Sequence, residues 1–352
     1  MADTIPVRAG EGIDLAPLEK YLRSTFRDLP SGELELTQFP TGASNLTYAL
    51  KVGDWEAVLR RPPLGPVAPK AHDMGREFRV LQALVGHFQL APKPLAFCDD
   101  HSVLGAPFFL MERRHGIVLN TDFPTGVTPT RDLGRRLSQQ MVNELVGLHQ
   151  VDYTKTDLVH MTRPEGFMKR QVDGWISRYN RAKTDDVQGV EELMKWLADG
   201  VPEESGCAII HYDYKFNNAM FNRELTQMVG LFDWEMTTVG DPLADLGAAM
   251  SYWLQADDPE MLKVGLGKPP ITIKDGFFTR REFIEAYAQQ SGRDVSRSHF
   301  YVTFAFFKLA VIIQQIYYRY KAGQTNDSRF MNMNHGVAAL VEWALQSVRR
   351  PD

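Results

Sequence analysis

The first third of the chain has the hydrophobic pattern of short β-strands. Apolar and polar residues alternate over 34–39, and β-forming residues are frequent in the two runs that follow. Gly53-Asp54 separates those two runs, and a Gly-Asp pair at such a position is typical of a hairpin turn. Strands are therefore expected at 34–39, 45–52 and 55–61.

A helix and a further strand complete this region. After a proline-rich loop, residues 71–87 place apolar side chains at helical spacing, and the apolar run 107–111 ends in charged residues. Residues 1–112 are thus predicted to form a small antiparallel sheet with one helix inserted.

The pattern becomes helical from Arg131 onward. Apolar residues recur every three or four positions up to His149, which predicts an amphipathic helix. The most apolar run, from Tyr301 to Ile316, is interrupted by Lys308 and is too short to span a bilayer, so we expect a buried helix there. Further helices are predicted at 167–183, 190–199, 241–255, 280–291, 297–320 and 333–349.

Together these patterns predict an α+β fold of two lobes. The strand-rich lobe is expected over residues 1–112 and the larger, mainly helical lobe over 113–352.

Composition narrows the class of protein. The 352 residues carry a formal net charge of −5 and a pI near 6.0, and without a basic block this argues against a nucleic-acid-binding surface. The two cysteines, Cys98 and Cys207, cannot form a disulfide framework or a CxxC zinc site. No secretory signal is visible near the N-terminus. We expect a cytoplasmic protein, with neither a nucleic acid nor a membrane as a partner.

The candidate chemistry lies in a second predicted hairpin. Two apolar runs, 219–221 and 228–232, flank a polar stretch. In a hairpin, the residues that enter the first strand and leave the second lie together at the open end. Here these are Asn218 and Asp233, and an amide oxygen with a carboxylate suits Mg²⁺. Asp213, on the preceding loop, could accept a proton from a hydroxyl nucleophile. Each residue taken alone is also explained as a turn or a cap.

The combined pattern carries more weight than any single residue. His211-Tyr212-Asp213 is followed by Asn218, then by a strand, a turn, a strand and Asp233, as in the catalytic segment of kinases. The sequence resembles the aminoglycoside phosphotransferase/choline kinase-like family, a branch of the protein-kinase-like fold. The family pattern of His-Gly-Asp, four residues and Asn matches these positions, except that a tyrosine replaces the glycine.

The resemblance extends over most of the chain, from about residue 30 to 345. The run 240–246 resembles the family in general. The runs 39–48 and 58–63 are similar in particular to the phosphotransferase domain fused ahead of some acyl-CoA dehydrogenases. This resemblance implies a bilobal protein-kinase-like fold, ATP as co-substrate, Mg²⁺, a small hydroxylated acceptor and a functional link to an acyl-CoA dehydrogenase.

The strand-rich lobe contains the expected nucleotide site. The first hairpin places Arg60 opposite Thr47, beside a loop of small residues whose backbone N–H groups could hold phosphate oxygens. By the resemblance, Arg60 binds the nucleotide phosphates and Glu77 orients it through an ion pair; taken alone, both would be solvent-exposed charges. The expected nucleotide-binding residues are Thr41, Gly42, Ser44, Asn45, Arg60 and Glu77, with Met111, Glu112 and Arg113 as a hinge against adenine.

Three further residues lie near Asp213 in the sequence. His211 is expected to be structural, bonded to the loop backbone. Lys215 either aims at the transferred phosphoryl group, as the corresponding lysine of protein kinases does, or is solvated. Tyr212 stands where the family has glycine, and this substitution could change substrate access.

The helix that follows the second hairpin begins with two acidic residues. Asp241 is expected to cap the helix ahead of Pro242. Asp245 either braces the catalytic loop, as the resemblance implies, or is an ordinary first-turn carboxylate.

The expected activity is transfer of the γ-phosphoryl group of ATP to a hydroxyl of a small molecule. Asp213 and Lys215 are the expected catalytic residues, and Asn218 and Asp233 the expected metal ligands. A hydroxyacyl-CoA or a related metabolite is the acceptor that the dehydrogenase-associated resemblance suggests. The alternative is a catalytically silent nucleotide-binding module that regulates a partner enzyme.

Overall fold

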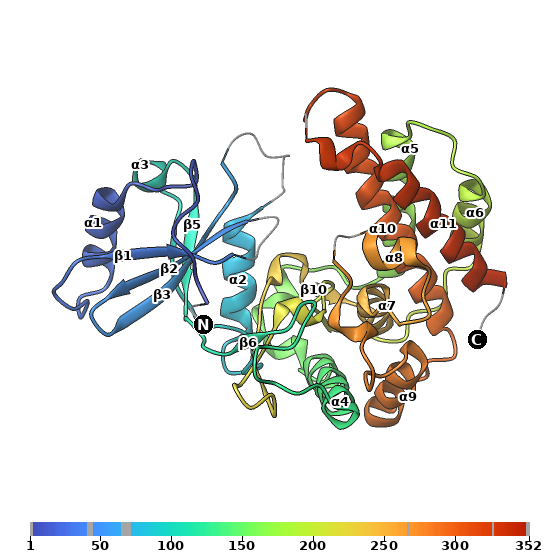
Figure 1. Cartoon of the computed structure of the whole chain (residues 1–352), viewed down its shortest axis with the longest axis horizontal. Coiled ribbons are helices and arrows are strands. Elements are labelled where there is room, and N and C mark those ends of the chain that lie inside the picture. The colour runs from blue at the N-terminus through green and yellow to red at the C-terminus, as the bar shows by residue number, and fades with distance from the viewer. Residues whose placement is uncertain (1–2, 41–44, 65–71, 266–267, 326, 350–352) are drawn as a thin grey trace. The chain divides into compact units, whose positions relative to one another are not determined.

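The computed structural model describes residues 3–40, 45–64, 72–265, 268–325 and 327–349 (Figure 1). Thr41, Gly42 and Ser44 of the expected phosphate loop lie outside these described residues.

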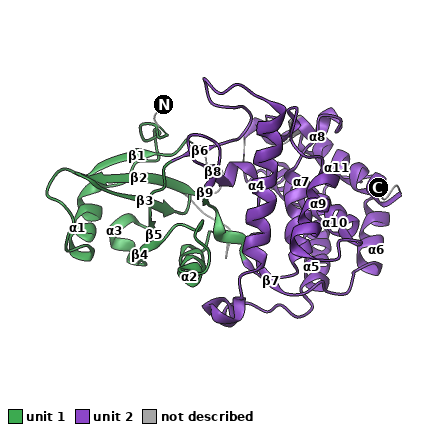
Figure 2. Ribbon diagram, turned by 90° about the horizontal axis from the view of Figure 1, so that it is seen from below, with its two compact units in different colours: residues 1–115, 229–237 green, residues 116–228, 238–352 purple. Residues whose placement is uncertain are grey.

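The chain divides into two compact units, which Figure 2 distinguishes by colour. Unit 1 consists of Met1–His115 and Val229–Thr237, and unit 2 of Gly116–Met228 and Thr238–Asp352. The first division lies close to the expected boundary after residue 112. The short segment that ends unit 1 comes from the part of the sequence assigned to the second lobe.

Unit 1 is built on a five-stranded antiparallel sheet with the strand order β1-β2-β3-β5-β4. Gly53 has a positive φ of 57° in the turn between β2 and β3, and the predicted pairing of Thr47 with Arg60 is present in this hairpin. The strands are β1 Glu35–Gln38, β2 Leu46–Val52, β3 Trp55–Arg61, β4 Pro94–Cys98 and β5 Phe108–Met111.

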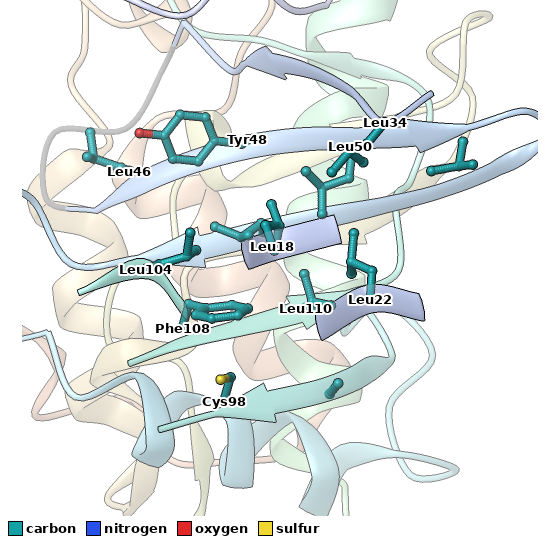
Figure 3. Close-up of a cluster of buried hydrophobic side chains, with 13 residues drawn as sticks. Leu18, Leu22, Leu34, Leu46, Tyr48, Leu50, Cys98, Leu104, Phe108 and Leu110 are labelled. Carbon is teal, nitrogen blue, oxygen red and sulfur yellow. The ribbon is translucent and has the colours of Figure 1, made fainter. Parts of the chain in front are cut away.

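One face of this sheet carries the hydrophobic core of unit 1. Leu18 and Leu22 of helix α1 are fully buried in a cluster with Tyr48, Leu50 and Phe108 of the sheet (Figure 3). The helices of unit 1 are α1 Leu15–Thr25, α2 Met74–Leu84 and α3 His101–Leu104. Only α2 was predicted. It begins where the Asp73 carboxylate accepts the Arg76 N–H at 2.8 Å.

Unit 2 is mainly helical. All the helices predicted from periodicity are present, and α8 is an additional one. The helices are α4 Arg131–His149, α5 Phe167–Ala182, α6 Val190–Asp199, α7 Pro242–Tyr252, α8 Glu260–Gly265, α9 Arg280–Ser291, α10 Ser298–Lys321 and α11 Met333–Arg349.

Short strands and single-turn 3₁₀ helices position the loops outside the five-stranded sheet, in unit 2 and in the segment 229–237 of unit 1. β7 Ala208–Ile210 pairs with β10 Thr238–Gly240, and β6 Ile117–Val118 pairs with β8 Ala219–Phe221, both antiparallel. The predicted second hairpin is confirmed by its turn, in which the Asn222 N–H donates to the Gln227 carbonyl at 2.9 Å ahead of β9 Met228–Leu231. Single-turn 3₁₀ helices lie at Tyr153–Lys155, Asp157–His160, Phe216–Asn218, Trp234–Met236, Ile271–Ile273 and Ser328–Phe330.

Helix α10 is the central helix of unit 2. Its length and apolar composition alone would allow it to cross a membrane, but 78% of its most apolar window is buried inside the protein. It packs against α5, α7 and α11. The predicted buried helix is therefore confirmed. The helix extends beyond the apolar run 301–316 at both ends, as the predicted range 297–320 implies.

Candidate functional site

The Asp213 carboxylate is held by two neighbours on its own loop in unit 2. Lys215 Nζ lies 2.9 Å from Asp213 Oδ2, and Asn218 Nδ2 donates to the same oxygen at 2.9 Å. Asn218 Nδ2 also donates to the Asp213 carbonyl at 2.9 Å. The structure thus brings three of the predicted site residues together in one hydrogen-bonded cluster.

Asp245 braces this loop from α7. Its carboxylate accepts the backbone N–H groups of His211 at 2.7 Å and of Tyr212 at 2.8 Å. Burial alone would raise the pKa of Asp245, but the His149 hydrogen bond at 3.1 Å and the nearby His149 and His211 rings hold this pKa below its usual value. Asp245 is therefore a loop brace and not an ordinary first-turn carboxylate.

The neighbouring Asp241 has the predicted capping role. Its side chain accepts the Leu243 N–H at 2.9 Å at the start of α7, with Pro242 in the first turn. It also accepts the Tyr301 hydroxyl at 2.7 Å, so the cap ties α7 to α10.

His211 has the structural place that was expected. Its ring is fully buried, and Nδ1 accepts the Asp213 N–H at 3.3 Å. The imidazole therefore holds the backbone of the loop beside the candidate base.

Lys215 is not a solvated lysine. Its side chain is 25% exposed and paired with Asp213, and Nζ lies 4.6 Å from the centroid of the Tyr252 ring. The alternative that Lys215 is a solvated lysine was wrong, because its ammonium group contacts both the Asp213 carboxylate and the face of the Tyr252 ring. A role toward a phosphoryl group stays a prediction.

Tyr212 adopts the backbone conformation that explains why the family has glycine there. Its φ is +66°, in the left-handed region, which costs a non-glycine residue about 1–3 kcal/mol. The ring is buried and makes an edge contact with Phe167 on α5. Burial raises the pKa of its hydroxyl well above the ordinary value. Side-chain packing therefore compensates for the strained backbone.

In unit 1, Arg60 lies among three carboxylates. Its Nε is 3.0 Å from Glu77 Oε2, and its Nη2 is 2.5 Å from Asp233 Oδ1 and 3.9 Å from Glu235 Oε2. Burial opposes its charge, but these carboxylates raise the pKa of Arg60 further above its high ordinary value. Burial raises the pKa of Glu77 to about 7, although the Arg60 charge lowers it. The ion pair expected for Arg60 and Glu77 is present.

Helix α2 holds the loop that carries Asp233. Arg76 donates to the Glu235 carbonyl at 2.7 Å and to the Thr237 carbonyl at 2.5 Å. The Trp234 N–H donates to Glu77 at 3.3 Å. These bonds support Asp233, whose φ is +68°.

Sequence reasoning missed Glu235 and His72. Asn45 Nδ2 donates to Glu235 Oε2 at 3.0 Å, and His72 Nδ1 lies 2.8 Å from Asn45 Oδ1. Glu235 lies two positions after Asp233, in the segment on which the family resemblance rests. The motif could therefore have identified it as a site residue. Nothing in the spacing of His72 or Arg76 pointed to this site.

The expected hinge is firmly bonded within unit 1. Met111 is buried on β5 and pairs with Val58. The Glu112 N–H donates to the Lys93 carbonyl at 2.8 Å. Arg113 pairs with Asp3 at 2.9 Å. The Glu112 amide is therefore engaged inside the protein, and an adenine-binding role for this hinge stays a prediction.

The donors expected to hold Mg²⁺ have suitable chemistry. Because the Asn218 amide nitrogen is committed to Asp213, the carbonyl oxygen is the atom that can serve as a ligand. Asp233 offers a carboxylate that is 22% exposed. Hard oxygen donors of this kind fit Mg²⁺. Within the described ranges, no group of three or more His, Cys, Asp or Glu side chains is arranged to hold a metal.

Residues 35–269 match the family described as "Phosphotransferase enzyme family". The curated relatives are longer proteins. The chain is 33% identical to mouse acyl-CoA dehydrogenase family member 10 over 97% of its own length and 32% of the relative. It is 31% identical to rat acyl-CoA dehydrogenase family member 11 over 99% of its length and 45% of the relative. The chain therefore spans less than half the length of these two relatives.

Solved structures of similar fold cover nearly the whole chain. A candidate aminoglycoside phosphotransferase from Ralstonia eutropha is 26% identical, with a TM-score of 0.78 over 96% of this chain and 99% of its own. Choline kinase from Cryptosporidium parvum is 12% identical, with a TM-score of 0.66 over 96% of each chain. An aminoglycoside phosphotransferase in a ternary complex with AMP-PNP and hygromycin B is 14% identical, with a TM-score of 0.59 over 94% of this chain and 98% of its own.

The predicted fold class is thus confirmed as α+β with a protein-kinase-like, bilobal architecture. The chain belongs to the phosphotransferase enzyme family, whose members are small-molecule kinases that act on hydroxyl groups.

Proposed function

We propose that this protein transfers the γ-phosphoryl group of ATP to a hydroxyl group of a small metabolite. The observation that carries the proposal is Arg60, a buried cation fixed by Glu77 and Asp233 in unit 1. A fixed, fully ionised guanidinium is suited to phosphate oxygens, and a paired carboxylate keeps it oriented.

Asp213 acts as the proton acceptor in this proposal. The acceptor hydroxyl oxygen attacks the γ-phosphorus and forms a new P–O bond, while the bond from that phosphorus to the β-phosphate oxygen breaks. Asp213 takes the hydroxyl proton, so that the products are the phosphate ester, ADP and one proton. Its contacts with Lys215 and Asn218 hold the carboxylate in one orientation, and positioning of this kind supplies much of the catalysis in phosphoryl transfer.

Asn218 and Asp233 would hold Mg²⁺. When bound, the ion supplies neutralisation of the phosphate charge. ATP as co-substrate is supported by the similar fold of the aminoglycoside phosphotransferase that was solved with AMP-PNP. In unit 1 the nucleotide would contact the loop that ends at Asn45 and the hinge around Glu112.

A hydroxyacyl-CoA or a related hydroxylated metabolite is the proposed acceptor. The support is that the matched relatives are named acyl-CoA dehydrogenase family members. A functional link between this chain and an acyl-CoA dehydrogenase belongs to the same proposal.

The proposal is tested first by binding. Mg²⁺ and AMP-PNP are titrated calorimetrically into the wild type, Asp233→Ala and the exposed control Glu285→Ala. We expect metal-dependent binding that Asp233→Ala weakens at least tenfold and that the control leaves unchanged. No binding to the wild type would refute the proposal.

The second test is turnover. Consumption of ATP is followed with hydroxyacyl-CoAs, free hydroxy acids and aminoglycosides as acceptors. We expect turnover with one acceptor class and its loss in Asp213→Ala. Nucleotide binding without turnover on any acceptor would favour the silent regulatory module instead.

A further inference from the structure

A single lysine lies in the middle of the most apolar helix of unit 2. Lys308 is preceded by Phe306 and Phe307 and followed by Leu309 on α10, and only 5% of it is exposed. Moving an ammonium group out of water costs several kcal/mol unless other groups compensate for its charge. The surroundings of Lys308 show what supplies that compensation.

The Lys308 ammonium lies against Tyr212. Its Nζ is 3.5 Å from the centroid of the Tyr212 ring and donates to the Tyr212 carbonyl at 3.5 Å, with the Trp175 ring of α5 at 5.8 Å. The charges of Asp213 and Asp245 favour its charged form, whereas Lys215 and Arg178 oppose it. The lysine is therefore placed toward the catalytic loop by a ring face, a carbonyl and the field of two carboxylates.

The carbonyl that Lys308 contacts belongs to the peptide group that joins Tyr212 to Asp213. The N–H of the same peptide group donates to His211 Nδ1 at 3.3 Å. Lys308 and His211 thus hold opposite edges of one peptide plane, immediately before the candidate base. On the other side of Tyr212, Asp245 accepts the two preceding N–H groups.

We propose that Lys308 is a positioning residue for phosphoryl transfer, which fixes the Tyr212–Asp213 peptide and thereby the direction of the Asp213 carboxylate. The inference rests on the proposed function of Asp213. It also explains why a tyrosine is retained at position 212, where glycine would adopt the backbone conformation without strain. The Tyr212 ring provides the face that the Lys308 ammonium group contacts.

A purely structural role would give a different result on substitution. Methionine in place of Lys308 removes the charge and the donor, keeps a similar volume and suits an apolar helix. It is therefore expected to fold, and its stability near neutral pH should not fall. The loop would lose one of the two contacts that hold the peptide plane, and a misdirected catalytic group costs roughly tenfold to a hundredfold in rate.

The test compares Lys308→Met with Lys308→Arg and with Gln314→Met. Arginine keeps a cation and N–H donors. Gln314 is a matched control, since it is buried on the same helix and donates to the Ala182 carbonyl at 2.7 Å. The measurements are kcat and KM with ATP and the acceptor found in the turnover screen, the melting temperature, and amide hydrogen exchange of peptides that cover 208–221.

We expect Lys308→Met to lower kcat by about tenfold to a hundredfold with the KM for ATP unchanged, and to accelerate exchange over 211–214. Lys308→Arg should lie between it and the wild type. Gln314→Met should lower the melting temperature and leave kcat unchanged. If Lys308→Met keeps kcat within twofold of the wild type, or if kcat falls only in parallel with melting temperature across all three variants, the inference is wrong. A wild type that binds nucleotide and transfers no phosphoryl group overturns the proposed function itself, and the positioning role with it.

Discussion

The Glu77 carboxylate on α2 lies 3.0 Å from the Arg60 guanidinium on β3, and their side chains are only 2% and 9% exposed. Burial disfavours both charges, since it opposes the Arg60 cation and raises the pKa of Glu77, and the attraction between the two partners offsets this effect. An ion pair of this kind contributes little when it is compared with a well-packed apolar pair, but removing Glu77 leaves the buried Arg60 charge only partly compensated, by Asp233 and Glu235.

Glu77→Ala should therefore be strongly destabilising. We expect the free energy of unfolding to fall by about 3 kcal/mol and nucleotide binding to weaken, because Arg60 loses the group that orients it. Urea unfolding and calorimetry with AMP-PNP measure the two effects. Glu285→Ala, an exposed carboxylate on α9, should change the stability by no more than about 0.5 kcal/mol. Equal effects of the two substitutions would contradict this account of the pair.

Asp245→Asn should lower activity more than its effect on stability explains. An asparagine has one carbonyl oxygen, so it cannot accept the His211 and Tyr212 N–H groups with two oxygens as Asp245 does. We expect kcat to fall by about tenfold or more because the loop that carries Asp213 loosens.

Asp258→Asn is the control for Asp245→Asn. Asp258 is also a buried carboxylate of unit 2, paired with Arg280 at 2.5 Å, and its carboxylate accepts hydrogen bonds from Gln255 and Arg280 rather than from the loop that carries Asp213. Its loss should lower the melting temperature and leave kcat within twofold. A comparable drop in kcat from both substitutions would show that general destabilisation, and not the brace, controls activity.

The burial of Lys308 is expected to make the stability of the protein depend on pH in one direction. Burial lowers the pKa of Lys308 from its ordinary 10.5 to about 8. Between these values the unfolded chain binds more protons at this side chain than the folded protein does, so the contribution of Lys308 to stability rises with pH. The total change is about 3 kcal/mol, from roughly 1.4 kcal/mol for each pKa unit.

The measurement is urea unfolding of the wild type and Lys308→Met across pH 7.5–10.5. Other titrating groups are common to both proteins and cancel in the difference between them. The stability of the wild type relative to the variant should increase as the pH rises. A flat or falling difference would mean that the ammonium has an ordinary pKa in the folded protein.

Two glycines in helices of unit 2 should respond oppositely to alanine. A Cβ atom at Gly247 on α7 would lie 2.6 Å from the Tyr301 backbone on α10, whereas at Gly147 on α4 it would meet no heavy atom within 4 Å. We expect Gly247→Ala to destabilise by about 1–3 kcal/mol or more because the two helices must separate. Gly147→Ala should stabilise by about 0.5–1 kcal/mol through helix propensity. Thermal unfolding of both variants measures these changes in stability. A Gly247→Ala variant that is more stable than the wild type would mean that α7 and α10 can move apart without a loss of stability.

Much of the fold follows from local patterns in the sequence. The helices of unit 2 have long apolar stripes or strong caps, and α4 begins and ends at the predicted residues, Arg131 and His149. The pairing of Thr47 with Arg60 follows from the short turn of the first hairpin, because a turn at a fixed position allows only one register between the two strands. Strand β4, which begins at Pro94, and the six-residue α8 were not predicted, since such short elements depend on tertiary packing.

The candidate site could be predicted only in part. The catalytic-loop residues are close together in the sequence, so a motif finds them. The supports come from distant elements: Arg76 from α2, His149 from α4 and Lys308 from α10. A lysine in an apolar helix was visible as an anomaly, but its partner Tyr212 is nearly a hundred positions away, and no local rule joins the two.

The division of the chain has a consequence for how unit 1 can exist. Residues 229–237 belong to unit 1, yet at both ends the backbone continues into unit 2. A fragment that stopped at His115 would lack Trp234, against which Phe88 packs with ring centroids 5.8 Å apart, and Asp233, which pairs with Arg60. Unit 1 is thus completed by a segment that lies between two stretches of unit 2 in the sequence, so neither unit is one continuous piece of chain that a single cut could release intact.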